Sequence, residues 1–193
     1  SGFQRTPSMR PDSMAAPTKI TYFYPRLSVY GASLSGRAGE GVLSLEAAYY
    51  DSRQDRSGGD FSIPNSQTRL LVGYQIQPVE DLSLGLQYYA EYMHEYSAYR
   101  AALPAGFPVE KRLNHTITLR ATQLLQHQTL RLSLYASYNA SNGDHFVNPE
   151  LRYSFTDRVW GALGANFFGG KPGGQFGQLS RDDNVYLQVR YEF

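Results

Sequence analysis

The chain has 193 residues, a formal net charge of +1, no cysteine and a mean hydropathy of −0.44. The balanced charge argues against a dedicated nucleic-acid surface, and the lack of cysteine excludes disulfides and thiolate metal sites. No run of about 18 apolar residues is present, so no transmembrane helix is expected. The 16 tyrosines and 18 glycines suit a β-barrel with a wet interior, or a soluble β-sandwich.

Nine amphipathic strands are predicted along the chain, after a proline-rich opening (residues 1–18) that shows no periodicity. In each strand apolar and polar residues alternate, which places the two sets on opposite faces of a sheet. The first strand is the weakest, because Pro25 and Gly31 interrupt it. The fourth continues its alternation to Glu91 and Glu95. The nine strands are expected near residues 22–36, 43–50, 69–77, 82–95, 113–121, 130–139, 147–155, 159–168 and 184–193.

The last strand is the clearest of the nine. Val185, Leu187, Val189, Tyr191 and Phe193 are apolar at every second position, with polar residues or Tyr186 between them. This pattern, closed by an aromatic C-terminal residue, resembles the final strand of a bacterial outer-membrane β-barrel.

The connections show a second regularity, since short turns and mostly longer links alternate along the chain. Short turns are expected at residues 38–41, 78–81, 126–129 and 156–158, and the other links at 55–67, 98–111, 141–144 and 169–183. Tight turns at one end and longer loops at the other are typical of outer-membrane barrels, where they face the periplasm and the outside. The expected fold class is therefore an all-β, antiparallel transmembrane β-barrel over residues 19–193, preceded by an irregular extracellular segment, residues 1–18.

The strand count is odd, whereas single-chain bacterial barrels hold an even number and begin in the periplasm. If Phe193 lies at the periplasmic rim, the first strand starts at the outer surface. The strands could be misjudged, the chain could be the C-terminal part of a larger barrel, or a second chain could supply the rest. We expect the C-terminal part of a larger barrel, because unpaired strand edges are costly in lipid.

Three segments carry a resemblance to a family: residues 155–170, 175–178 and 183–193. They are similar to the C-terminal end of an uncharacterised family of large, porin-like barrels of Gram-negative bacteria. The resemblance implies a barrel of about sixteen strands, located in the bacterial outer membrane, and it assigns no residue a role.

The charged residues expected inside the barrel are the candidate site. Cross-strand ion pairs between them could stiffen the wall, or opposed charges could select solutes in a water-filled channel. The candidate pore-lining residues are Glu46, Arg69, Glu91, Glu95, Arg120, Arg131, Glu150, Arg152 and Arg190. The aromatic residues expected to anchor the barrel at the membrane interface are Tyr153, Phe155, Tyr191 and Phe193.

No residue pattern predicts catalysis. His115 has no serine alternating with it on its own strand, His127 falls in a tight turn, and Glu91 and Glu95 would be about 13 Å apart along a strand. The spacings that bind metals are absent, so no metal and no cofactor is expected.

The expected function is a porin-like channel for passive diffusion of small solutes, rather than an enzyme. The expected partners are the lipid bilayer, lipopolysaccharide and the strands that complete the barrel, and no nucleic acid. Two alternatives are a structural sheath around a periplasmic or cytochrome partner, and a surface barrel whose loops bind a ligand.

Overall fold

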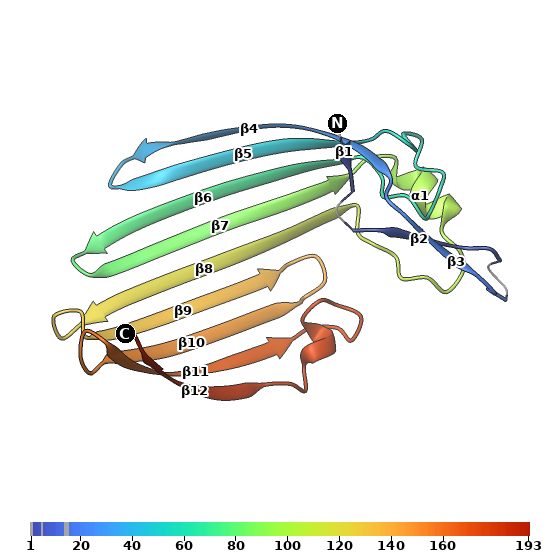
Figure 1. The fold of residues 1–193 in the computed structure, drawn as a ribbon. Coiled ribbons are helices and arrows are strands. Elements are labelled where there is room, and N and C mark those ends of the chain that lie inside the picture. The colour runs from blue at the N-terminus through green and yellow to red at the C-terminus, as the bar shows by residue number, and fades with distance from the viewer. Residues whose placement is uncertain (1, 5, 14–15) are drawn as a thin grey trace. The chain divides into compact units, whose positions relative to one another are not determined.

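The computed structural model describes residues 2–4, 6–13 and 16–193, and these form an all-β fold (Figure 1). Ten of the described strands make one sheet in the order β1-β4-β5-β6-β7-β8-β9-β10-β11-β12. From β4 onward, each strand is hydrogen-bonded to its neighbours in the chain. The strands are β1 Gly2–Phe3, β4 Arg26–Ala38, β5 Gly41–Ser52, β6 Gln67–Val79, β7 Leu82–Met93, β8 Leu113–Leu125, β9 Leu130–Asn139, β10 His145–Ser154, β11 Val159–Gly169 and β12 Asn184–Tyr191.

The nine predicted strands are confirmed as β4 to β12. The sheet of the described residues is open, because its strand order has two ends, β1 and β12. Closure into a barrel and insertion into a membrane stay predictions. No helix in the described part of the chain is both long and apolar enough to cross a membrane.

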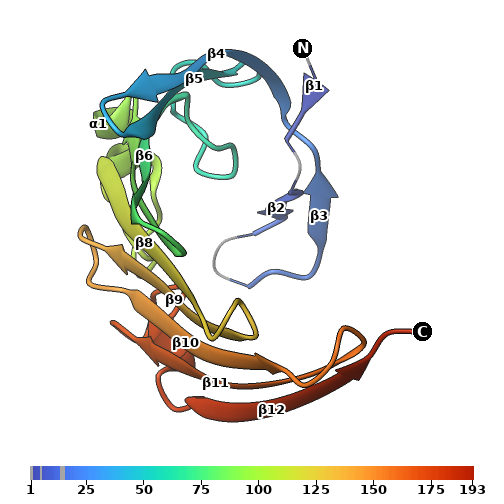
Figure 2. The same ribbon diagram turned by 90° about the vertical axis from the view of Figure 1, so that its left-hand side faces the viewer.

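The opening segment is more regular than its sequence predicts. Residues 1–18 contain two short strands, β1 and β2 (Ser8–Pro11). β1 pairs antiparallel with β4, and β2 pairs antiparallel with β3 (Ile20–Phe23) (Figure 2). Asp12 fastens this hairpin by accepting hydrogen bonds from the Thr18 hydroxyl and from the backbone N–H groups of Thr18 and Lys19. These bonds, the first above all, lower the pKa of Asp12 to about 2.

The interpretation of residues 1–18 as irregular is therefore wrong for the two short strands. Alternation is the only signal for a strand that sequence reasoning used, and strands of two and four residues are too short to show it. Part of that segment, residues 1, 5, 14 and 15, lies outside the described residues.

The chain divides into two compact units, and β4 to β7 contribute residues to both. Unit 1 comprises residues 1–33, 46–70 and 91–113, and unit 2 comprises residues 34–45, 71–90 and 114–193. Unit 1 contains the β2–β3 hairpin and α1, and unit 2 contains nearly all of β8 to β12.

Unit 1 differs from the sequence prediction at the end of the fourth predicted strand. β7 ends at Met93, and Glu95 is instead the N-cap of α1 (Tyr96–Ala102), with a left-handed φ of 48°. Because that conformation stops a strand, Glu91 and Glu95 do not share one. The helix is held by Tyr99, which is buried and whose hydroxyl accepts a hydrogen bond from the Glu110 N–H at 3.1 Å.

Unit 2 has two chemically distinct faces over strands β8 to β12, which lie side by side in chain order (Figure 1). The printed registers run Leu132 opposite Leu151, Leu151 opposite Leu163, and Leu163 opposite Leu187. One row of four leucines therefore crosses β9 to β12 on a single face. The next row, on the other face, contains Arg131, Arg152, Ala162 and Gln188.

The two ends of the strands carry different connections, as predicted. The turn between β8 and β9 contains three consecutive non-glycine residues with left-handed φ, Gln126 at 52°, His127 at 55° and Gln128 at 68°. The links from β5 to β6, from β7 to β8 and from β11 to β12 are long, and the last contains a 3₁₀-helix at Gly177–Leu179. The alternation of short turns with mostly longer loops is confirmed.

Candidate functional site

Unit 2 brings five of the predicted pore-lining residues onto one face of β8 to β12. Arg131 is opposite Arg152, and Arg120, Glu150 and Arg190 are opposite Tyr135, Ser133 and Trp160. Since residues opposite each other share a face and successive residues alternate between faces, all five point to the same side of the sheet. The prediction that these five side chains share one face of the sheet is therefore confirmed. That this face lines a pore stays a prediction.

Three of the four arginines on this polar face contact aromatic or hydroxyl groups rather than carboxylates. The Arg152 guanidinium lies 3.8 Å from the centre of the Trp160 ring, and that of Arg120 lies 5.4 Å from the Tyr135 ring. Arg131 Nε donates a hydrogen bond to Ser133 Oγ at 3.0 Å. Such cation–π contacts orient a guanidinium and leave its charge uncompensated.

A polar network joins β10, β11 and β12 on the same face. The Tyr186 hydroxyl donates to Glu150 Oε2 at 2.8 Å, and Asn148 Nδ2 donates to the Ala165 carbonyl at 2.9 Å. Gly164 makes room for this arrangement, since a Cβ there would overlap the Tyr186 ring. The network holds Tyr186 across the strands and engages the carboxylate of Glu150.

The predicted ion pairs form at only some positions. In unit 1, Arg69 Nε lies 3.0 Å from Glu91 Oε2, and its guanidinium stacks 4.1 Å from the Tyr50 ring. In unit 2, Arg190 Nε lies 3.4 Å from Glu192 Oε1, but these residues are two positions apart in the chain, so the pair does not cross between strands. Glu46 is exposed on β5. Among the described residues, Arg120, Arg131 and Arg152 take part in none of the salt bridges.

The predicted anchoring aromatics lie together in pairs near the short turns of unit 2. Tyr153 contacts Phe155 edge to face at 5.0 Å between ring centres, and Tyr191 lies 6.3 Å from Phe193. Tyr153 and Tyr191 are on the leucine face, as the pairing of each with β11 shows. All four are exposed, which suits an interfacial position, although anchoring itself stays a prediction.

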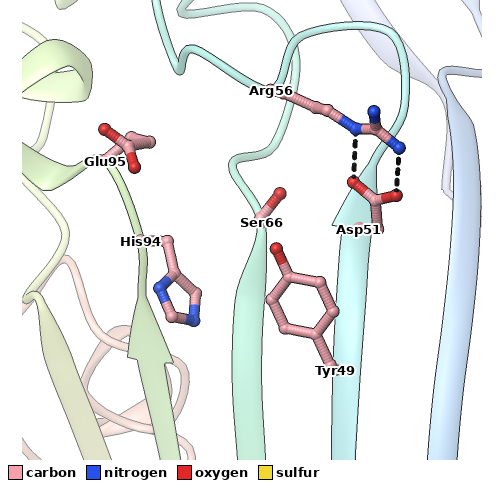
Figure 3. A pocket seen from close by; sticks show the side chains of 6 residues that line it. All are labelled: Tyr49, Asp51, Arg56, Ser66, His94 and Glu95. Atoms are coloured by element: carbon pink, nitrogen blue, oxygen red, sulfur yellow. Dashed lines mark hydrogen bonds and ion pairs between the residues drawn. The ribbon is translucent and has the colours of Figure 1, made fainter.

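Sequence reasoning missed a polar pocket in unit 1, with a cavity of about 260 Å³ (Figure 3). Arg56, from the link after β5, reaches back to Asp51 and donates two hydrogen bonds to its carboxylate, at 2.9 and 2.7 Å. His94 Nε2 shares a hydrogen bond of 2.8 Å with Thr68 Oγ1. The pocket is lined by Tyr49, Asp51, Arg56, Ser66, His94 and Glu95.

The link that carries Arg56 is fixed by local hydrogen bonds. Asn65 Nδ2 donates to the His94 carbonyl at 2.9 Å and to the Glu95 carbonyl at 3.3 Å. Gly58 has a left-handed φ of 69° and packs on Asn65 so closely that a side chain would collide. These contacts join distant positions of the chain, so no local motif could reveal the pocket. Of its residues, only Glu95 is among the predicted site residues, as a candidate for lining a pore.

We expect the link to loosen at low pH because of Asp55. Its carboxylate accepts hydrogen bonds from the Ser57 hydroxyl at 2.6 Å and from the Gly58 and Asp60 N–H groups at 3.1 and 2.7 Å. Burial raises the pKa of Asp55. The hydrogen bonds together lower it by more than burial raises it, so the pKa lies below its ordinary value. The stabilisation is then complete above the pKa of the unfolded carboxyl, about 3.9, and is lost as the pH falls through the lower folded pKa.

Amide-exchange protection of Gly58 and Asp60 measures this effect. Protection should be constant at neutral pH and fall as the solution is acidified below about pH 4. Asp55→Asn should show low protection at every pH. Protection that does not depend on pH in the natural sequence would contradict the assignment.

Two of the histidines are hydrogen-bonded to neighbouring groups. The His115 ring is hydrogen-bonded to the Tyr88 hydroxyl through Nδ1 at 3.2 Å, and His145 Nδ1 donates to the Gly143 carbonyl at 3.1 Å. Within the described part of the chain, no group of three or more His, Asp or Glu side chains is arranged to hold a metal ion.

Comparison with known proteins gives no family model and no curated protein that matches this chain. The function is therefore argued from the leucine face, the polar face and the pocket.

Proposed function

We propose that this chain forms part of the wall of an outer-membrane β-barrel that acts as a porin-like channel for small solutes. The observation that carries the proposal is the leucine face of unit 2. Its row of leucines is uncovered, with exposed fractions of 38% for Leu132, 43% for Leu151, 52% for Leu163 and 77% for Leu187. Fully removing one such side chain from water gains about 1.5–3 kcal/mol, so a lipid environment stabilises this face.

The apolar surface continues along β12 and beyond the leucine row. Val185 and Val189 flank Leu187 on the same face and are 72% and 70% exposed. A contiguous apolar surface of this extent is unusual for a monomeric soluble protein and marks an interaction with membrane or protein. The alternation of apolar and polar faces along strands of 8 to 13 residues favours a bilayer, with water on the other side.

The polar face supports a water-filled interior. It carries arginines, Glu150 and hydroxyl groups such as that of Ser133. In lipid, the open edges of the sheet would leave backbone groups unpaired at several kcal/mol each. The proposal therefore includes further strands, from an upstream fragment or a second chain, that complete the barrel in contact with the bilayer and lipopolysaccharide.

Conductance across a planar bilayer tests the proposal. The detergent-purified particle is first examined on a denaturing gel with intact mass, which identifies any polypeptide that completes the barrel. We expect stepwise current increments that persist at constant voltage, with none from detergent alone. A particle that is inserted, as shown by protection of its strands from protease, and that passes no current would contradict a channel.

A ligand-binding role is the second candidate, and the pocket of unit 1 favours it. The buried Asp51 held by Arg56 beside Tyr49 and His94 gives the pocket charge, hydroxyl groups and an aromatic wall. Removing residues 55–64 should abolish ligand capture and leave the sheet intact if this role is correct. Unchanged capture would exclude the pocket.

A further inference from the structure

We infer that the polar face of unit 2 carries an oxyanion site, formed by Arg131 on β9 and Arg152 on β10. The site would bind solutes that bear a carboxylate or phosphate group. This inference deepens the proposed channel by naming its solute class, and it rests on the assignment of this face to the interior. Binding and conduction are nevertheless measured separately.

The first observation is the register that sets two like charges against each other. Arg131 on β9 and Arg152 on β10 are direct cross-strand partners. Like charges directly opposite each other destabilise a sheet, and opposite charges stabilise it. A bound anion between the two side chains would turn the repulsion into attraction.

The second observation is the shortage of carboxylates on this face. Strands β9 to β12 carry three arginines, Arg131, Arg152 and Arg190, and one acidic residue, Glu150. Glu150 already accepts the hydrogen bond from Tyr186. Glu192, which follows β12, lies against Arg190 and also accepts a hydrogen bond from Trp160 Nε1 at 3.4 Å. Neither glutamate forms a salt bridge with Arg131 or Arg152 among the described residues.

The third observation is that the arginines are held in place. The Arg152 guanidinium lies over the Trp160 ring, 3.8 Å from its centre, and Arg131 is hydrogen-bonded through Nε to Ser133. A stacked guanidinium keeps the N–H groups at its edge free, and two N–H groups in one plane match the two oxygens of a carboxylate or phosphate.

Trp160 provides a direct readout, because it is the only tryptophan of the chain. Its fluorescence should respond when an anion moves the guanidinium that covers the ring. The experiment titrates inorganic phosphate into the detergent-solubilised, intact particle at constant ionic strength, with chloride as the replaced ion. Tryptophans of any co-purifying chain are replaced by phenylalanine. We expect a saturable change with phosphate and with acetate.

Arg131→Gln is the test variant, since it removes one charge and leaves the Arg152–Trp160 stack in place. The dissociation constant for phosphate should rise about tenfold, as expected for the loss of one charged hydrogen-bonding partner. Arg131→Lys keeps the charge but loses the planar guanidinium. Its dissociation constant for phosphate should lie between those of the natural sequence and Arg131→Gln. Arg181→Gln, which changes an exposed arginine of the β11–β12 link, is the matched control and should bind as the natural sequence does. A thermal melt verifies that each variant is folded.

The outcomes separate the site from the channel. A response that is linear in phosphate, or equal for Arg131→Gln and Arg181→Gln, overturns the oxyanion site even if the particle conducts. Saturable binding that depends on Arg131 supports the site even if no current flows. In that case the proposed channel function is the part that is rejected. Where current flows, the reversal potential in a salt gradient should favour anions, and Arg131→Gln should shift it toward zero.

Discussion

Leu187→Arg is expected to lower the free energy of unfolding from a lipid bilayer by about 2–4 kcal/mol, the cost of an arginine near the middle of the membrane. Leu187 is near the middle of β12, is 77% exposed and ends the leucine row of unit 2. In water, a substitution at so exposed a position changes stability by about 0.5 kcal/mol or less. The large effect therefore depends on lipid, and denaturant titration of the completed barrel in lipid vesicles measures it.

Gln188→Arg is the matched control, because Gln188 is the next residue and lies on the polar face opposite Ala162. Its arginine stays in water, and screened repulsion from the arginines nearby should cost at most about 1 kcal/mol. Equal losses for the two variants would show that the leucine face is not in contact with lipid.

Gly177→Ala is expected to disrupt the link between β11 and β12. Gly177 is buried, and a Cβ there would overlap the carbonyl oxygen of Lys171 and lie 2.6 Å from its carbonyl carbon. Backbone cannot move aside as a flexible side chain can, so we expect a local loss of about 1–3 kcal/mol, as for other overpacked sites. The neighbouring Phe176, which stacks 5.4 Å from Phe146, should lose its place.

Hydrogen exchange of two backbone amides measures the effect. The Gly174 N–H donates to the Lys171 carbonyl at 2.8 Å, and the Leu179 N–H donates to the Phe176 carbonyl at 2.9 Å. Both amides should exchange faster in Gly177→Ala. Gly173→Ala is the control, because nothing lies within 4 Å of a Cβ at Gly173. Similar exchange in the two variants would mean that the packing at Gly177 does not hold the link.

The alternation of residues was enough to predict the long strands and their faces. Leu187 and Gln188 were assigned to opposite faces from parity alone, because the side-chain period of a strand is two. Parity does not say which residue of the next strand lies opposite. The row of leucines and the opposition of Arg131 to Arg152 depend on register, which the turns set, and so they emerged only from the structure.

The elements that sequence reasoning missed are short or non-local. Helix α1 has seven residues, two turns in which a 3.6-residue period cannot be recognised. The left-handed conformation of Glu95 ended a strand that alternation alone would have extended. Arg56 and His94 line the same pocket although they are far apart in the sequence, and neither lies in a recognisable motif.

Pairing between chain neighbours, which builds the sheet from β4 to β12, has a consequence for folding kinetics. Each new strand can dock on the one made just before it, so the loop closed at each step is a single link between chain neighbours. Folding can then advance one hairpin at a time without a long-range nucleus. The edge at β12 has no further neighbour among the described strands. If a second chain supplies further strands, as the proposed function includes, their pairing with this edge would be the slow, concentration-dependent step.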